Sequence, residues 1–116
     1  MKKPTPKTLE RAAQAALDKK ARDLALLDLN GVATFAGHFL ICTGESARQV
    51  QAIADSIQER LNDEGVTLHH VEGYRLGEWV LLDYVDFIVH IFSPKARAFY
   101  DLERLWRPAA RLPVPE

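Results

Sequence analysis

The amino-acid sequence predicts an α/β domain of the layered α+β kind, in which helices cover a mixed five-stranded sheet. Apolar residues at helical spacing mark three segments as helices, and short apolar runs bounded by turn residues mark five segments as strands. These elements follow the order α-β-β-α-β-β-β-α, which is typical of helices packed on a mixed sheet. The 116 residues, 47% of them hydrophobic and 27% charged, suffice for one folded core.

The chain is expected to form a single domain over residues 8–107. Residues 1–7, which contain prolines and lysines, are expected to be a mobile N-terminal lead, and residues 108–116 a loose C-terminal tail. We see no internal repeat in the sequence and no composition change that would mark a second domain.

Capping residues place the first two helices. Thr5 followed by Pro6 predicts the start of a helix whose apolar face is mostly alanine. Ser46, with Gln49 three residues later, is a capping box and predicts the start of the second helix. Gly65 is expected to end that helix in a left-handed conformation.

The strands and the last helix follow from apolar runs and turn residues. The expected strands are residues 23–29, 37–43, 66–71, 79–82 and 87–92. The last of these is apolar on both faces except for His90, which predicts an interior strand. Ser93 and Pro94 then begin a helix that ends at Pro108. Its packing face is expected to consist of Phe99, Leu102, Leu105 and Trp106.

Composition also limits the location of the protein. The longest apolar runs are far shorter than the roughly 20 residues that cross a bilayer, so we expect no membrane association. The basic start of the chain is not followed by the apolar segment of a secretory signal. The single cysteine, Cys42, fits the reducing cytoplasm.

Charge is unevenly distributed, although the net charge is only −1. Residues 1–22 carry seven Lys or Arg and two Asp or Glu, and residues 95–111 carry five and two. Residues 23–86 carry three and eleven, which argues against wrapping a nucleic-acid backbone. This acidic middle would suit a basic protein partner, and it is also compatible with ordinary solvated surface.

Two possible sites for phosphate chemistry have weak signals. The turn Thr43-Gly44-Glu45-Ser46 precedes a helix and could hold an anion, but it lacks the lysine of a P-loop. Asp83 and Asp86 could hold a divalent cation, yet their spacing of three residues differs from the spacing of two that puts strand side chains on one side. Both aspartates can equally satisfy backbone amides of a turn.

Histidine and cysteine chemistry is also weakly indicated. His69 and His70 are adjacent, so on a strand they would point to opposite faces. His38 and His90 are lone strand residues, and Cys42 lies in an apolar run where a thiol behaves as a small hydrophobe. We therefore expect no metal site, no cofactor and no cysteine nucleophile.

A binding surface is the hypothesis that spacing supports best. Aromatic and acidic residues gather in one stretch: Tyr74, Trp79, Tyr84, Glu72, Glu78, Asp83 and Asp86. Trp and Tyr are enriched among the residues that dominate binding energy at interfaces. Strand alternation would put Trp79 and Leu81 on one face of the sheet, and Val80, Leu82 and Tyr84 on the other.

Several motifs, in their order and spacing, resemble the ribosomal silencing factors of the Iojap/RsfS family over residues 9–107. They are Asp28-Leu29-Asn30-Gly31, Phe39-Leu40-Ile41-Cys42-Thr43-Gly44, Val71-Glu72-Gly73-Tyr74, Glu78-Trp79-Val80-Leu81-Leu82-Asp83-Tyr84 and Phe99-Tyr100-Asp101-Leu102-Glu103-Arg104-Leu105-Trp106. Each fragment alone would be a weak signal, but together they are specific.

The resemblance implies a non-enzymatic protein that binds the large ribosomal subunit through the L-fourteen ribosomal protein. It implies that the bound factor blocks the small subunit and represses translation when nutrients are scarce, and that the free factor is a homodimer. No sequence-specific nucleic-acid partner is expected. Carried over by position, the partner-binding residues are Gly73, Tyr74, Trp79, Leu81, Asp83, Tyr84, Asp86 and His90.

The resemblance also implies a nucleotidyltransferase-like fold without its active site. An enzyme of that type that uses Ser46, Asp83 and Asp86 remains the alternative, and a nucleic-acid binder that uses the basic ends is a third hypothesis. The sequence has Val85 where many relatives have glycine, so we expect this turn to differ slightly, because β-branched residues disfavour positive φ.

Overall fold

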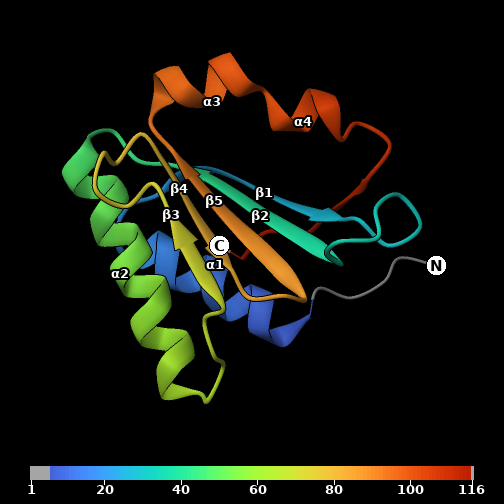
Figure 1. The fold of residues 1–116 in the computed structure, drawn as a ribbon, viewed down its shortest axis with the longest axis horizontal. Coiled ribbons are helices and arrows are strands. Elements are labelled where there is room, and N and C mark those ends of the chain that lie inside the picture. The colour runs from blue at the N-terminus through green and yellow to red at the C-terminus, as the bar shows by residue number, and fades with distance from the viewer. Residues whose placement is uncertain (1–5, 116) are drawn as a thin grey trace.

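The computed structural model describes residues 6–115, which form one sheet with helices on both sides (Figure 1). The six strands lie in the order β3-β4-β5-β2-β1-β6. Their bounds are β1 Arg22–Asp28, β2 His38–Thr43, β3 His70–Glu72, β4 Trp79–Asp83, β5 Phe87–Phe92 and β6 Ala110–Leu112. The helices are α1 Lys7–Asp18, α2 Ala47–Asp63, α3 Pro94–Tyr100 and α4 Leu102–Leu105. Among the strands of residues 6–115, only β2 and β5 pair in parallel.

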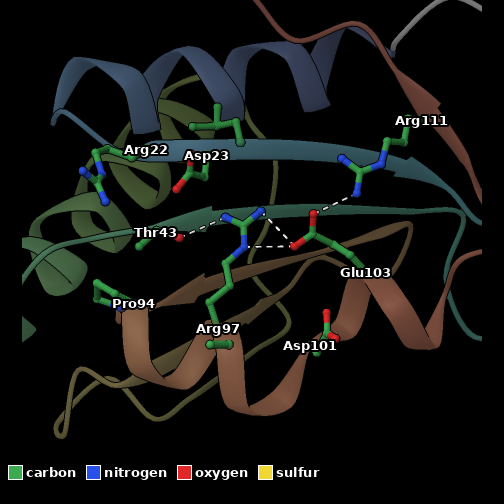
Figure 2. A pocket seen from close by; sticks show the side chains of 10 residues that line it. Arg22, Asp23, Thr43, Pro94, Arg97, Asp101, Glu103 and Arg111 are labelled. Carbon is green, nitrogen blue, oxygen red and sulfur yellow. Dashed lines mark hydrogen bonds and ion pairs between the residues drawn. The ribbon is translucent and has the colours of Figure 1, made fainter.

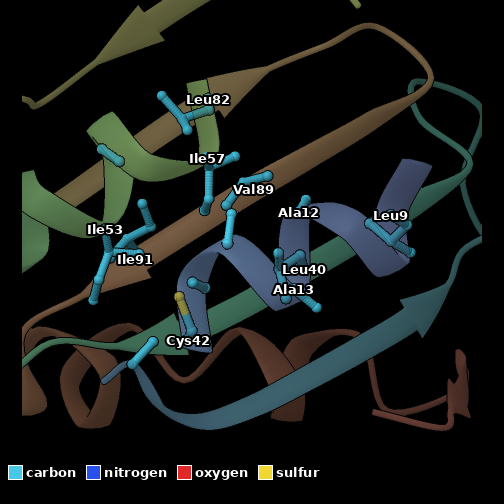
Figure 3. Packing of buried hydrophobic residues seen from close by; sticks show 14 of the residues in the cluster. Leu9, Ala12, Ala13, Leu40, Cys42, Ile53, Ile57, Leu82, Val89 and Ile91 are labelled. Atoms are coloured by element: carbon cyan, nitrogen blue, oxygen red, sulfur yellow. The ribbon is translucent and has the colours of Figure 1, made fainter. Parts of the chain in front are cut away.

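The larger part of the core lies between the sheet and the helices α1 and α2 (Figure 3). Leu40, Val89 and Leu82 point from three neighbouring strands into this layer and are fully buried. The expected alanine face of α1 is confirmed, and these small side chains let α1 approach α2 and the sheet closely. The opposite face of the sheet is covered by α3 and α4, which are much shorter (Figure 1).

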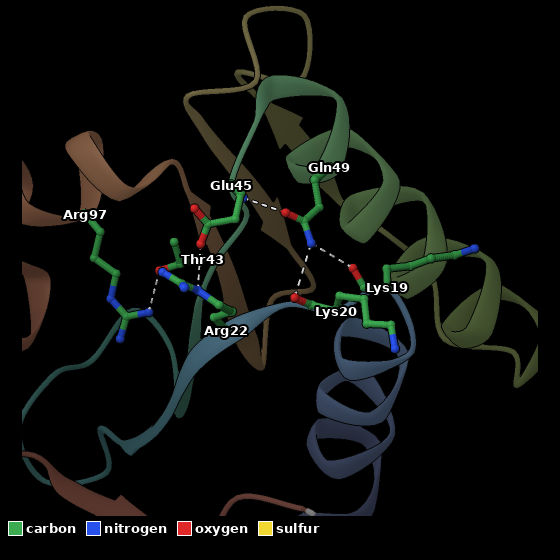
Figure 4. A network of polar contacts seen from close by, with 7 residues as sticks. All are labelled: Lys19, Lys20, Arg22, Thr43, Glu45, Gln49 and Arg97. Atoms are coloured by element: carbon green, nitrogen blue, oxygen red, sulfur yellow. Dashed lines mark hydrogen bonds and ion pairs between the residues drawn. The ribbon is translucent and has the colours of Figure 1, made fainter.

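The predicted start of α2 is confirmed, with one difference in the capping box. The Ser46 hydroxyl accepts the Gln49 amide at 3.1 Å, as expected. The Gln49 side chain, however, accepts the amide of Glu45 at 2.6 Å rather than that of Ser46. Its amide nitrogen also donates to the carbonyls of Lys19 and Lys20 at 3.1 and 3.2 Å. One side chain therefore joins the end of α1 to the start of α2 (Figure 4).

The expectation of five strands and a loose tail is wrong at the C-terminus. Residues Ala110–Leu112 form β6, which pairs antiparallel with β1 and buries Leu112. Without this strand β1 would be an open edge with unpaired amides and carbonyls, and covering it is favourable. The third expected strand, residues 66–71, is shorter and later than predicted, because only His70–Glu72 pair with β4. The predicted mobile lead and the cap at Thr5 fall on residues 1–7, of which 1–5 lie outside the described residues, and α1 begins at Lys7.

The last helix is broken in two at Asp101, which has φ 47° in the left-handed region. Because of this break, the side chains after Asp101 point in other directions than they would in one continuous helix. Phe99 and Leu105, expected on the packing face, are 78% and 68% exposed. Leu102 and Trp106 pack on the sheet as expected.

Val85 occupies the turn between β4 and β5 with φ 74°, in the region that glycine favours. The turn is closed by the Asp83 carboxylate, which accepts the Val85 amide at 2.8 Å. A β-branched residue is unfavourable at this φ, so Val85 carries backbone strain.

Replacing Val85 by glycine should raise the free energy of unfolding by about 1 kcal/mol. The gain is the left-handed strain of roughly 1–2 kcal/mol, reduced by the greater flexibility of glycine in the unfolded chain. Urea denaturation of Val85→Gly measures it. Val85→Ala keeps a β-carbon and should gain less, and a glycine variant less stable than the native protein would show that the turn is not strained.

Candidate binding face on the sheet

The alternation predicted for β4 is confirmed and separates its two sides. Val80 and Leu82 are fully buried against α1 and α2. Trp79, Leu81 and Asp83 point to the other side and are partly exposed. We use the name β4–β5 face for the side of the sheet formed by Trp79, Leu81, Asp83, Ile88 and His90. The register places Leu81 opposite His90 and Asp83 opposite Ile88.

Trp79 is fixed in place from three directions. Its ring lies 5.0 Å from that of Phe92 and 4.5 Å from that of Tyr100, measured between ring centroids. Its indole Nε1–H donates a hydrogen bond to Nδ1 of His90 at 3.1 Å. A large aromatic side chain that is partly exposed and already ordered loses little conformational freedom on binding.

His90 is 4% exposed and stays neutral because burial lowers its pKa to about 4. Nδ1 accepts the hydrogen bond from the indole N–H, so the proton of the neutral imidazole ring must be on Nε2. Nε2 is buried and has no hydrogen-bond partner among the described residues. The ring is held instead by the edge-on ring of Phe39 at 4.5 Å between centroids. An unsatisfied buried donor of this kind costs about 1–3 kcal/mol.

The loop before β4 is attached to α2 and not to the β4–β5 face. The Gln51 side chain donates to the Tyr74 and Arg75 carbonyls at 2.8 and 3.2 Å, and the Tyr74 hydroxyl donates to Asp55 at 3.1 Å. Gly73 has φ 77°, and a β-carbon there would collide with the Trp79 carbonyl oxygen. Gly73 thus allows the chain to enter β4, whereas Tyr74 holds the loop.

Tyr84 lies in the core on the α1 and α2 side. It is 6% exposed and stacks on Phe87 with 5.0 Å between ring centroids. Burial raises the pKa of its hydroxyl to about 12. The structure therefore groups Trp79, Leu81, Asp83 and His90 of the sequence-predicted residues, and it places Tyr74 and Tyr84 elsewhere. Asp86 is exposed in the β4–β5 turn.

The residues of the alternative enzyme do not converge. The Gly37 amide donates to the Asp86 carbonyl at 2.8 Å, so Asp86 lies at the start of β2. Ser46 follows the other end of that six-residue strand. At about 3.3 Å per residue, roughly 16 Å of extended chain separates these ends. Ser46 and the aspartates therefore do not lie together at one site.

The remaining chemical candidates have structural roles. Within residues 6–115 no group of three or more His, Cys, Asp or Glu side chains could hold a metal ion. Cys42 is fully buried, and burial raises the pKa of its thiol to about 12, so the reactive thiolate is disfavoured. The Ser46 hydroxyl is occupied as the α2 cap.

Sequence reasoning missed the contribution of α3 to the β4–β5 face. Tyr100 is 48% exposed and packs on Trp79, so it extends the aromatic surface beyond the strands. Phe99 continues this surface, with 5.0 Å between its ring centroid and that of Tyr100. The only available sign was Asp101, since Asn and Asp tolerate the left-handed conformation that breaks the helix there.

Comparison with known proteins identifies the family. A family model described as "Ribosomal silencing factor during starvation" matches residues 2–116. The ribosomal silencing factor RsfS of Bacillus subtilis is 43% identical over 101 residues, covering 87% of this chain and 86% of that one. A crystal structure from Chromobacterium violaceum has a TM-score of 0.85 at 35% identity, covering 95% of this chain and 88% of that one. One from Bacillus halodurans has a TM-score of 0.81 at 40% identity, with 91% and 98% covered.

The chain belongs to the ribosomal silencing factor family, as the motif resemblance predicted. Its mixed α+β fold is likewise confirmed by these solved structures, with one strand more than expected. None of the helices described for residues 6–115 is long and apolar enough to cross a membrane.

His90 should make the stability of the fold depend on pH. Its pKa is about 4 in the folded protein and near 6.5 when unfolded, so the unfolded chain binds more protons between these values. The contribution of neutral His90 to the free energy of unfolding is therefore retained above pH 6.5 and lost as the pH falls towards 4. We expect urea denaturation to show a loss of about 2 kcal/mol between pH 7 and pH 5. His90→Gln should lack this component, and an equal loss in that variant would contradict the assignment.

Proposed function

We propose that this protein binds the large ribosomal subunit through the β4–β5 face and thereby prevents the small subunit from joining. The contacted component would be the L-fourteen ribosomal protein, and the result would be repression of translation under nutrient limitation. The observation that carries the proposal is a partly exposed, preordered Trp79 on an incompletely covered sheet face, in a chain of the ribosomal silencing factor family.

Apolar area on this face supports a protein partner. Trp79, Leu81 and Ile88 are all partly exposed, and Tyr100 adds further aromatic surface. Such side chains gain free energy when a partner removes them from water, at roughly 25 cal/mol per Å² of apolar area. Trp79, which packs among the rings of Phe92, Tyr100 and His90, is the type of residue that dominates binding energy at interfaces.

Acidic groups at the edge of the face support a basic partner. Glu72 lies opposite Leu81 in the register of β3 with β4, and its carboxylate is 2.7 Å from His70. Asp83 follows on the same side of β4. These carboxylates would pair with basic side chains of a ribosomal protein and so favour its approach and orientation.

Steric exclusion and a free homodimer complete the proposal. The described part of the chain measures 39 × 33 × 27 Å. A copy bound at the subunit interface would therefore hold the large and small ribosomal subunits apart at that place. In the free protein, a second copy would cover the same apolar face, because exposed apolar surface favours self-association. Dimerisation and ribosome binding would then compete.

Replacing Trp79 by alanine should weaken binding to purified large subunits by about 30-fold. This corresponds to roughly 2 kcal/mol, the usual loss for a hot-spot residue. Co-sedimentation at increasing protein concentration measures the affinity, and addition of small subunits measures the block of joining. Leu81→Lys should also weaken binding, because it introduces a positive charge on the same face.

The matched control is Tyr74→Ala, which removes an aromatic side chain bound to α2. It should leave the affinity within about threefold of the native value. Circular dichroism establishes that each variant is folded. If folded Trp79→Ala and Leu81→Lys bind as the native protein does, while Tyr74→Ala does not, the docking surface is the loop on the α2 side and not the β4–β5 face.

A further inference from the structure

We propose a second contact surface, which binds the phosphate backbone of RNA. We name it the basic rim, and its residues are Lys95 on α3, Arg104 on α4, Arg107 after α4 and Arg111 on β6. That this RNA belongs to the large ribosomal subunit rests on the proposed function, because the large subunit contains both protein and RNA. The rim itself follows from the charges and contacts of these residues.

The basic rim carries positive charge that the fold does not neutralise. Lys95, Arg104 and Arg107 are exposed, and none forms an ion pair with a described carboxylate. Arg111 forms an ion pair with Glu103 at 2.9 Å, yet its side chain is 62% exposed. Three uncommitted cations and one shared cation on neighbouring elements are suited to a polyanion.

A partly buried ion pair joins the elements that carry the rim. The Arg97 guanidinium donates to the Thr43 hydroxyl at 2.9 Å and to Glu103 at 3.0 Å, and the other oxygen of Glu103 accepts from Arg111 at 2.9 Å (Figure 2). Arg97 and Glu103 side chains are only 15% and 23% exposed. This chain of contacts joins α3, α4 and β6 to β2, so the rim is held on rigid structure.

The arginines of the rim border a groove with a small excess of positive charge. A groove of about 340 Å³ is lined by Arg104, Arg107 and Arg111 together with the carboxylates of Asp101 and Glu103. Guanidinium groups present planar donors that match phosphate oxygens. The larger neighbouring groove, about 590 Å³, is less suited to phosphate, because Asp23 adds a third carboxylate to Asp101 and Glu103 there.

The basic rim and the β4–β5 face lie on the same side of the sheet. The α3–α4 segment covers this side and carries Tyr100, which contacts Trp79, as well as Lys95 and Arg104 (Figure 1). A single large partner could therefore engage both surfaces without wrapping around the protein. Protein contacts would fix its position, and phosphate contacts would add affinity that depends on salt.

The test is binding of a fluorescein-labelled 20-base-pair RNA hairpin, followed by anisotropy over a range of KCl concentrations. The native protein should bind with an affinity that falls steeply with salt. Arg104→Ala combined with Arg107→Ala should reduce the slope of log K against log [KCl] by about 1.4–1.8, since each lost phosphate contact contributes roughly 0.7–0.9. Replacement of both by lysine should restore most of the slope.

The matched control is Arg48→Ala with Arg75→Ala, which removes the same charge from exposed arginines outside the rim. It should leave the slope nearly unchanged. The inference is overturned if the native protein does not bind the hairpin, if the two double variants weaken binding equally, or if polyglutamate binds the native protein as tightly as the RNA does.

Failure of this inference can be told apart from failure of the proposed function. Trp79→Ala should bind the RNA hairpin as the native protein does, while it loses affinity for the isolated L-fourteen ribosomal protein. Arg104→Ala with Arg107→Ala should show the reverse pattern. If only the first pattern is observed, the β4–β5 face remains and the basic rim is rejected.

Discussion

The parallel pairing of β2 with β5 is the constraint on which the rest of the structure depends. Parallel neighbours cannot be joined by a tight turn, so the chain must cross over between them, and here the crossover contains α2, β3 and β4. Together with α1, α2 fills one face of the sheet. The short α3–α4 segment and the loop between β1 and β2 cover the other face. A helix is about 10 Å wide, whereas six strands at about 4.8 Å spacing span roughly 24 Å, so part of that face stays open.

Local sequence patterns correctly predicted elements that are determined by residues close together in the chain. The bounds of β5 and the cap of α2 at Ser46 agree with prediction, because apolar runs and capping residues act within a few positions. The strand β6 could not be predicted, since three residues with no distinct pattern become a strand only by pairing with β1. The break at Asp101 was missed because the apolar spacing on either side still fits a continuous helix.

The candidate site was predicted in part for the same reason. Period-two alternation correctly separated Trp79 and Leu81 from Val80 and Leu82, because a strand places successive side chains on opposite faces. The same alternation put Tyr84 on the side of Val80 and Leu82, where it is buried in the core. The place of Tyr74 depends on tertiary contacts with α2. Nearness in the sequence alone had grouped both tyrosines with Trp79, and the fold separates them. Within the β4–β5 face, the hydrogen bond from Trp79 to His90 joins an exposed contact residue to a buried one.

The central claim is that the β4–β5 face meets the large ribosomal subunit. The most direct measurement replaces Leu81 with the photocrosslinking residue p-benzoylphenylalanine and identifies what it captures on purified large subunits. The control places the same residue at Glu59, which is exposed on α2. We predict a crosslink to the L-fourteen ribosomal protein from position 81 and none from position 59. A crosslink from position 59 alone would place the docking surface on the opposite side of the sheet and contradict the account.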